Sequence, residues 1–234
     1  GCWDGFAGAD VAEILAYQGW DWIVFDSEHG PLNFETMQNL IMATSATETV
    51  PIVRVAWNDP VLIKRALDIG AYGVVIPWVN NKQEAMNAVA ACKYPPEGIR
   101  GCGPRRAANY GMDPDYLKQA NDEVLVVAQI ETVEAVKNLK EILAVPEIDV
   151  FFIGPSDMAA SQGLLGQITN QKNLDTIRKA VEIGSKTSVA PGMYALSPDH
   201  VNQHIKEGFR FIAAGGAETF LRRGCREVLD KIKK

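Results

Sequence analysis

The hydrophobic pattern of the chain alternates between two types of segment. Short continuous apolar runs are typical of buried strands, and longer stretches with a period near 3.6 residues are typical of amphipathic helices. The apolar runs predict eight strands, at residues 1–3, 21–26, 50–54, 72–77, 124–130, 149–153, 189–193 and 209–213. The periodic stretches predict helices at residues 10–18, 33–44, 60–69, 82–92, 133–143, 174–186, 198–207 and 218–231.

This alternation predicts the fold class. Strands that are apolar on both faces and separated by helices form a parallel sheet covered by helices. Eight such units closed on themselves make an α/β fold, the (β/α)8 TIM barrel. No GxGxxG turn follows the first strand, as a doubly wound nucleotide-binding sheet would require. Since no linker or low-complexity tract interrupts the pattern, we expect residues 1–234 to form a single domain.

Polar residues gather where the predicted strands end. In a TIM barrel the active site lies at the C-terminal ends of the strands, so residues just after each apolar run are candidates for function. The candidates are Asp26, Glu28 and His29 after the second strand, Arg54 at the end of the third, Gln129 and Glu131 at the fifth, and Gly154, Pro155, Ser156 and Asp157 after the sixth.

Two of these carboxylates indicate a metal site. Glu131 and Asp157 end consecutive strands, whose axes lie about 5 Å apart, so both can bind one cation. Oxygen ligands favour Mg²⁺ or Mn²⁺, with Co²⁺ tolerated. The alternative for each residue is structural, because an acidic residue after a strand also caps the helix that follows. The residues from Gly154 to Asp157 open a helix, whose amides can bind a carboxylate of a 2-oxo acid.

His29 is the candidate for proton transfer, since imidazole titrates near neutral pH and Asp26 is close enough to fix its tautomer. Arg54 would stabilise a developing enolate oxygen, or else pair with Asp26 or Glu28 at the barrel mouth. Every lysine falls on an expected helix, a loop or the tail, which favours metal-assisted enolisation over Schiff-base chemistry. His200 and His204 are expected on the surface.

Composition narrows the partners and the compartment. The net charge of −6 argues against nucleic-acid binding. No apolar run is long enough for a membrane span or resembles a signal peptide. The widely spaced cysteines lack a CxxC pair, so we expect reduced thiols in a cytoplasmic protein.

Six motifs in this order resemble the HpcH/HpaI class II pyruvate aldolases over nearly the whole chain. They are Trp3 after the first strand, DSEH at 26–29, Val53-Arg54 with WNDP at 57–60, YPPEGIRG at 94–101, QIE at 129–131 and GPSD at 154–157. The resemblance implies metal-dependent cleavage of a 4-hydroxy-2-oxo acid to pyruvate and an aldehyde through a metal-bound enolate. It assigns the metal to Glu131 and Asp157, the acid–base dyad to His29 and Asp26, and the enolate to Arg54. Gln129 would line the metal site and Trp3 one wall of the pocket.

The resemblance also implies a homohexamer, a dimer of trimers in which the last helix swaps between neighbours and an adjacent subunit completes the active site. Packing of helix 218–231 on its own barrel is the alternative. This chain departs from the family's pattern at Ala217, where an aspartate is common, and in a basic loop. Arg105 and Arg106 in that loop would receive an anionic group at the far end of the aldehyde, or bridge subunits.

Three other functions are compatible with these residues. Oxaloacetate decarboxylation forms the same enolate and needs no aldehyde pocket. A citrate-lyase-like cleavage of an acyl-CoA would need a basic groove, which the sequence does not indicate. A barrel that only binds or assembles other molecules would have no need for the four converging groups His29, Arg54, Glu131 and Asp157.

Overall fold

A computed structural model describes residues 1–232, which form an eight-stranded parallel barrel. The strands are β1 (Cys2–Asp4), β2 (Trp22–Asp26), β3 (Val50–Arg54), β4 (Gly73–Ile76), β5 (Leu125–Ile130), β6 (Val150–Ile153), β7 (Ala190–Tyr194) and β8 (Phe211–Ala213). They pair in sequence order, and the seam between β8 and β1 is joined by hydrogen bonds from Trp3 N to Gly215 O and from Ala214 N to Gly1 O. The TIM-barrel prediction is confirmed, with each strand within two residues of its expected start.

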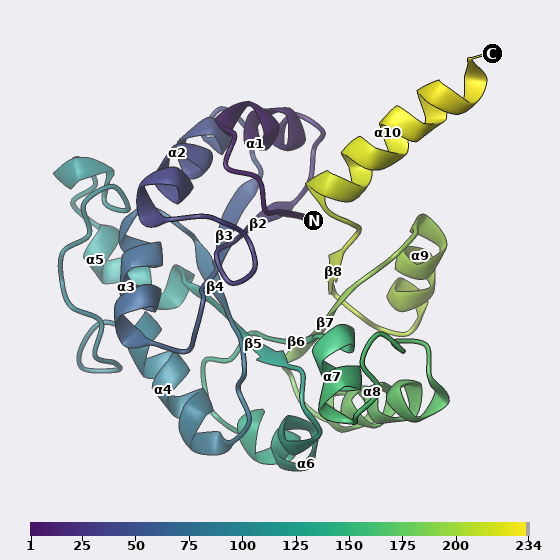
Figure 1. The fold of residues 1–234 in the computed structure, drawn as a ribbon. Coiled ribbons are helices and arrows are strands. Elements are labelled where there is room, and N and C mark those ends of the chain that lie inside the picture. The colour runs from purple at the N-terminus through teal and green to yellow at the C-terminus, as the bar shows by residue number, and fades with distance from the viewer. Residues whose placement is uncertain (233–234) are drawn as a thin grey trace.

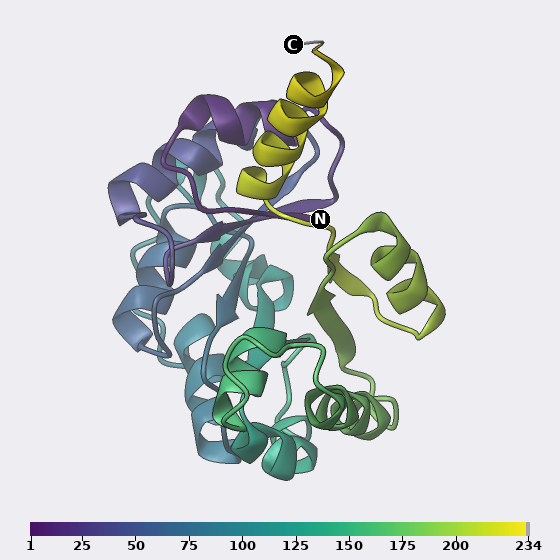
Figure 2. The same cartoon turned by 45° about the vertical axis from the view of Figure 1, so that its right-hand side comes forward.

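The helices surround the barrel (Figures 1 and 2). They are α1 (Ala9–Ala16), α2 (Phe34–Thr44), α3 (Pro60–Asp68), α4 (Lys82–Cys92), the 3-10 turn η1 (Asn109–Gly111), α5 (Tyr116–Glu123), α6 (Val133–Ile142), α7 (Pro155–Ser161), α8 (Gln171–Gly184), α9 (Pro198–Lys206) and α10 (Ala217–Lys231). The eight expected helices all form. Two short ones, α5 and α7, were not predicted as elements, although the GPSD motif did predict a helix start at α7.

The strands separate two layers of core. Side chains inside the barrel include Trp3, Trp22, Phe152 and Phe211, all at most 8% exposed. The indole of Trp22 stacks on Phe211 with ring centroids 4.0 Å apart. The outer layer lies between the strands and the helices and is built mainly from aliphatic residues. Because strand side chains alternate between these layers, both faces of each strand are apolar, which explains the continuous hydrophobic runs.

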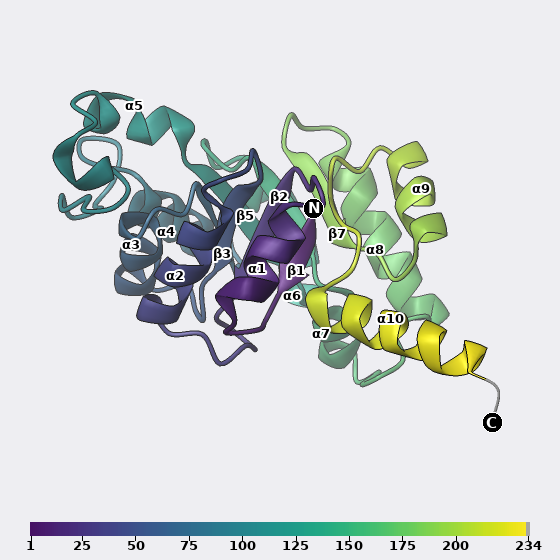
Figure 3. The same cartoon turned by 90° about the horizontal axis from the view of Figure 1, so that it is seen from above.

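Helix α10 leaves the barrel after its first turn and points away from it, as Figures 1 and 3 show. At its base Phe220 stacks on Trp20, with ring centroids 5.7 Å apart. Beyond that contact, residues 221–232 are all exposed. The helix therefore does not pack along its own barrel. Within residues 1–232, no helix is long and apolar enough to cross a membrane.

Candidate active site

A cavity of about 340 Å³ opens at the C-terminal ends of the strands. Its lining combines residues from the two sides of the barrel mouth: Trp3, His29, Arg54, Gln129, Phe152, Gly154, Pro155, Ser156, Asp157 and Tyr194. Eight of these ten were named from the sequence. The strand-end rule thus brought together residues that lie more than one hundred positions apart in the chain.

Arg54 is held by two carboxylates. Its Nε and Nη2 atoms donate to the two oxygens of Asp26 at 2.9 and 2.6 Å, a bidentate fork. Its Nη1 atom lies 2.9 Å from Glu28 Oε2. Burial acts to lower the pKa of Arg54, but Asp26 and Glu28 outweigh it and raise the pKa above its ordinary value. Arg54 is thus a fixed cation at the rim of the cavity. It pairs with Asp26 and Glu28 and also lines the cavity, so the two positions considered for it from the sequence are compatible.

His29 lies beside this pair on the turn after β2. Its side chain is 66% exposed, and its ring Nε2 is 4.0 Å from Glu28 Oε2. Asp26 Oδ1 accepts a hydrogen bond from the backbone amide of His29, at 3.3 Å. The expected contact of Asp26 with the imidazole is not found among the described residues, because Arg54 occupies both Asp26 oxygens.

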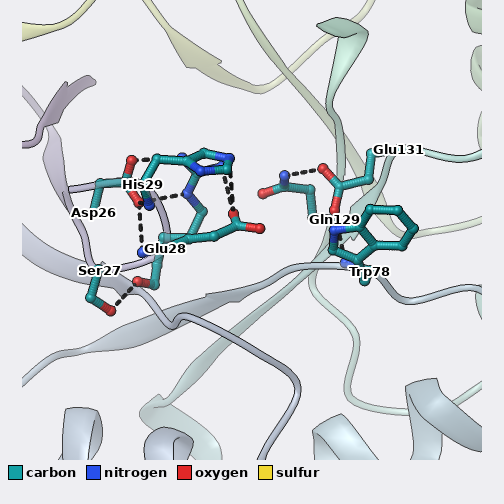
Figure 4. A network of polar contacts seen from close by, with 8 residues as sticks. Asp26, Ser27, Glu28, His29, Trp78, Gln129 and Glu131 are labelled. Atoms are coloured by element: carbon teal, nitrogen blue, oxygen red, sulfur yellow. Dashed lines mark hydrogen bonds and ion pairs between the residues drawn. The ribbon is translucent and has the colours of Figure 1, made fainter. Parts of the chain in front are cut away.

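Glu131 lies on the opposite side of the mouth, directly after β5. It is only 1% exposed, and its two oxygens accept hydrogen bonds from Trp78 N, at 2.8 Å, and from the Gln129 side-chain amide. Burial raises the pKa of Glu131, and the nearby charge of Asp157 raises it further. The two hydrogen bonds lower this pKa in part. Figure 4 shows Gln129 and Glu131 facing the Asp26–His29 turn across the mouth.

Neither carboxylate serves as a helix cap. The N-cap of α6 is Thr132, whose hydroxyl accepts from Ala135 N at 3.0 Å. The N-cap of α7 is Gly154, and Asp157 lies in the first turn of that helix. The structural alternatives considered for Glu131 and Asp157 are therefore excluded.

The donor set fits a divalent cation. Gln129 Oε1 is buried and has no hydrogen-bond partner among the described residues. The Gln129 amide nitrogen faces Glu131, and its oxygen points away from Glu131 (Figure 4). Glu131 and Asp157 lie close enough for the charge of Asp157 to raise the pKa of Glu131, and these two carboxylates are hard oxygen donors of the kind that Mg²⁺ and Mn²⁺ prefer. Within residues 1–232, three or more His, Cys, Asp or Glu side chains do not gather into a metal-binding group. The remaining ligands would be water and substrate oxygens.

Gly154 allows the close approach of β6 to Glu131. A Cβ atom at position 154 would lie 2.8 Å from Glu131 Oε2 and 2.9 Å from Glu131 Cβ. The amide of Gly154 donates to Ile130 O, and Pro155 has no amide hydrogen. Of the four residues expected to bind an anion, only Ser156 and Asp157 therefore have backbone amides left to donate.

An aromatic wall closes the third side of the cavity. Trp3 is 8% exposed and packs against Phe152 and Tyr194, with ring centroids 5.2 and 6.3 Å away. The Arg54 guanidinium lies 5.5 Å from the Trp3 ring centroid, within the range of a cation–π interaction. Trp3 thus forms the expected wall and also fixes the position of Arg54.

The basic loop does not reach this mouth. Arg106 donates to Ile69 O at 3.3 Å and to Ser45 Oγ at 2.9 Å, after the C-terminal ends of α3 and α2. There it lines a separate cavity of about 730 Å³ at the N-terminal ends of β3, β4 and β5. The expectation that Arg105 and Arg106 lie near this chain's own mouth is wrong, because the loop folds back under the barrel.

Three contributors were not named as site residues from the sequence. Tyr194 ends β7, so the strand-end rule could have found it. Phe152 lies inside an apolar run and gives no signal. Trp78 contributes its backbone amide from a left-handed conformation with φ of 57°, which bulky residues rarely adopt. That conformation aims the Trp78 amide at Glu131 and could not be read from residue types.

Together the fold and the site define a class of protein. A (β/α)8 barrel whose mouth holds two adjacent carboxylates, a fixed guanidinium and an exposed imidazole is suited to bind a small anion with a divalent cation. The chain belongs to the HpcH/HpaI aldolase/citrate lyase family, whose sequence profile matches residues 1–223.

Individual relatives agree with this assignment. A 4-hydroxy-2-oxo-heptane-1,7-dioate aldolase of Salmonella dublin is 42% identical over 227 residues, covering 96% of this chain and 86% of that protein. The crystal structure of an HpcH/HpaI aldolase/citrate lyase family protein from Burkholderia cenocepacia J2315 superposes with a TM-score of 0.96 at 33% identity, covering 100% and 93% of the two chains. Macrophomate synthase superposes with a TM-score of 0.89 at 30% identity, covering 99% and 82%.

Proposed function

We propose that this chain is a metal-dependent aldolase that cleaves a 4-hydroxy-2-oxo acid reversibly to pyruvate and an aldehyde. The observation that carries the proposal is the 42% identity, over 96% of the chain, with an aldolase named for a 4-hydroxy-2-oxo dicarboxylate. The convergence of His29, Arg54, Gln129 and Asp157 on one small cavity supports it. A 4-hydroxy-2-oxo-heptane-1,7-dioate is the first substrate to test.

Glu131 and Asp157 are the residues that would hold the cation, with Gln129 lining the site, and Mg²⁺ or Mn²⁺ would be preferred and Co²⁺ tolerated. The bound cation would supply Lewis acidity, which makes the keto group of the substrate a better electron acceptor. The buried Glu131 is held by two hydrogen bonds, so this ligand is fixed before a cation arrives.

The protein's own groups would act as follows. The Ser156 and Asp157 amides bind the substrate carboxylate at the start of α7. His29 takes the proton of the C4 hydroxyl, directly or through a water molecule, while the C3–C4 bond breaks. The electron pair of that bond gives the enolate of pyruvate, and the Arg54 guanidinium stabilises its oxygen. A proton delivered to C3 completes pyruvate, and C4 leaves as the aldehyde.

The aldehyde pocket is proposed to be completed by a second copy. Arg105 is exposed and lies next to Arg106 on the loop below its own barrel, so we propose that it reaches the mouth of a neighbour. There it would pair with the distal carboxylate of a dicarboxylic substrate. The exposed helix α10 supports a homo-oligomer in which this helix packs on a neighbour, and we propose the hexameric dimer of trimers.

We also propose a cytoplasmic location. Cys2, Cys92, Cys102 and Cys225 are all free thiols, which suits a reducing compartment. We expect all four cysteines to be alkylated in protein that is isolated and denatured in the presence of an alkylating agent, with the added groups counted by mass spectrometry. Disulfides in freshly isolated protein would contradict it.

The test of the proposed activity is pyruvate release from the dicarboxylic substrate, coupled to lactate dehydrogenase. The protein is stripped with EDTA and then given Mg²⁺, Mn²⁺ or Co²⁺. We expect activity only after metal is restored, and Arg54→Lys should lower kcat/KM by about 100-fold because lysine cannot form the Asp26 fork. Folded, metal-loaded protein that releases no pyruvate from 4-hydroxy-2-oxo acids would refute the proposal. Activity confined to oxaloacetate would instead indicate a decarboxylase.

A further inference from the structure

A second cavity lies at the opposite end of the barrel from the candidate active site. Its volume is about 730 Å³, against about 340 Å³ for the cavity at the mouth. Pockets of this size hold small organic molecules. It is bounded by the N-terminal ends of β3, β4 and β5, by the loop that carries Arg106, and by α5. Because chemistry in TIM barrels takes place at the other ends of the strands, this cavity is suited to binding a ligand rather than to the aldol reaction.

Arg100 supplies a buried positive charge to this cavity. Its side chain is 1% exposed, and its guanidinium lies over the Tyr94 ring, 4.4 Å from the centroid. Its Nη2 atom donates to Asp68 Oδ1 at 2.8 Å and to Tyr116 Oη at 3.1 Å. Burial acts to lower the pKa of Arg100, but Asp68 and the two tyrosines outweigh it and raise the pKa above its ordinary value. The group therefore stays charged.

The protein does not use all the donors of this guanidinium. Arginine has five N–H groups, and both hydrogen bonds of the Arg100 side chain come from Nη2. Within residues 1–232, Nε is buried without a partner and Nη1 donates no hydrogen bond. Arg54 at the mouth differs, because its three nitrogen atoms all face carboxylate oxygens. Arg100 thus keeps donors for an anion that enters the cavity.

Arg106 brings a second positive charge to the same cavity. Its guanidinium donates to two neutral oxygens, Ile69 O at 3.3 Å and Ser45 Oγ at 2.9 Å. Gly70 makes room for it, since a Cβ atom at position 70 would collide with Arg106 Nη1. Gly70 also has a φ of +104°, which side chains rarely allow. In the part of the chain that the structure describes, Arg106 pairs with no carboxylate, so its charge is available to a ligand.

Three carboxylates line the cavity as well, and none of them pairs with either arginine within the described residues. Glu48 and Glu123 are exposed, where water screens their charges. Asp113 accepts a hydrogen bond from Asp115 N at 3.1 Å. The charge of Arg100 is buried and therefore screened much less. An oxyanion that reaches the guanidinium groups is attracted more strongly than the exposed carboxylates repel it.

We propose that this cavity binds a small organic anion whose carboxylate or phosphate group pairs with Arg100 and Arg106. The planar guanidinium groups match the oxygens of either oxyanion. The remaining polar lining favours a ligand that also carries hydroxyl groups, because Thr47, Asn109 and Gln119 present hydroxyl and amide groups. The proposal concerns a second site at the base of the barrel and holds independently of the proposed aldolase activity.

The test is isothermal titration calorimetry of the full-length, metal-free protein with three matched probes. Glycerol 3-phosphate and glycerate are small hydroxylated anions that carry a phosphate or a carboxylate, and glycerol is their neutral counterpart. We expect at least one anion to bind at one site per chain and glycerol to show no binding. The comparison of the two anions shows which oxyanion the site prefers. Absence of binding by both anions would overturn the proposal.

Two neighbouring arginines provide a matched pair of variants. Arg106→Gln should weaken binding of the preferred anion by at least about 10-fold, because one of the two positive charges is lost. Arg105→Gln should bind as the wild type does, since Arg105 is exposed and does not line the cavity. Arg100→Lys should also weaken binding by at least about 10-fold. Should Arg100→Lys fail to fold, Arg106→Gln decides the question alone.

A variant at the mouth distinguishes the two cavities. Arg54→Lys should leave the affinity for the anion unchanged, because Arg54 lines only the cavity at the mouth. A loss of affinity in Arg54→Lys but not in Arg106→Gln would place the anion at the mouth and overturn the proposal. Equal affinities of Arg106→Gln and Arg105→Gln would overturn it as well. Calorimetry needs no turnover, so the result stands apart from whether the protein releases pyruvate.

Discussion

Asp4 is a carboxyl group that the fold removes almost completely from water. Asp4 is 0% exposed at the end of β1, and burial raises its pKa to about 6. One of its oxygens accepts from Phe6 N at 2.9 Å, and the other is buried without a partner among the described residues. Glu218 lies close enough to raise the pKa further. Asp4 therefore destabilises the fold whenever it is ionised.

Because burial raises the pKa of Asp4, we expect the stability of the folded protein to depend on pH. Its folded pKa of about 6 lies above the ordinary 3.8, so the folded state holds the proton more tightly than the unfolded state. The stabilisation that comes from this tighter proton binding is complete below pH 3.8 and is lost as pH rises through about 6. Asp4→Asn should therefore raise the free energy of unfolding by about 1–3 kcal/mol at pH 8 and much less at pH 4.5, measured by urea unfolding. An equal effect at both pH values would contradict this origin.

Glu131 gives the prediction for metal binding. Glu131→Gln keeps the acceptor for Trp78 N, and the amide of Gln129 can flip to accept from the new side chain, so the fold should be retained. The affinity for Mn²⁺ should fall by at least about 100-fold in calorimetry, because one charged ligand is lost. Glu141→Gln, on the exposed face of α6, is the matched control and should bind normally. Equal affinities would remove Glu131 from the metal site.

At the scale of elements, the junction between β6 and α7 sets the distance between the two carboxylates. Gly154→Ala would place a methyl group 2.8 Å from Glu131 Oε2, so the buried glutamate must move. We expect kcat/KM to fall by about 100-fold and stability to fall by about 1–3 kcal/mol. Gly103→Ala is the control, since its Cβ would have nothing within 4 Å. A fully active Gly154→Ala enzyme would show that this close approach is dispensable.

The sequence predicted the elements better than the loops between them. Strand periodicity located all eight strands, and the predicted helices 33–44 and 133–143 begin within one residue of α2 and α6. The path of residues 101–115 was not predictable. Arg106 donates to Ile69 O after α3 and to Ser45 Oγ after α2, and no local pattern encodes these contacts.

The same limit applies to the site. Strand-end positions identified the cavity residues, because the fold fixes where strands end. The partner of Arg54 was not predictable, since Asp26 and Glu28 lie on the same turn and either could reach the guanidinium. Which carboxylate binds Arg54 side-on depends on the register of β2 against β3, where Asp26 lies beside Arg54.

At the scale of the whole molecule, α10 carries an apolar stripe that its own barrel does not cover. Leu221, Val228 and Leu229 are each at least 60% exposed and lie on one face of the helix. We expect sedimentation to show an oligomer that Leu221→Glu with Leu229→Glu dissociates. Arg222→Gln, also exposed on α10, should leave the assembly intact. A wild-type monomer at all concentrations would refute the role of this stripe.

The carboxylates that gather at the mouth also affect how fast a substrate arrives. In the metal-free protein, Asp26, Glu28, Glu131 and Asp157, when ionised, place four negative charges against the single positive charge of Arg54, in a chain of net charge −6; a bound divalent cation would offset two of them. Such a field repels a 2-oxo acid during its diffusional approach. Added salt screens this repulsion, so the association rate constant should increase with ionic strength, opposite to the behaviour of an enzyme that attracts its anionic substrate with a basic funnel.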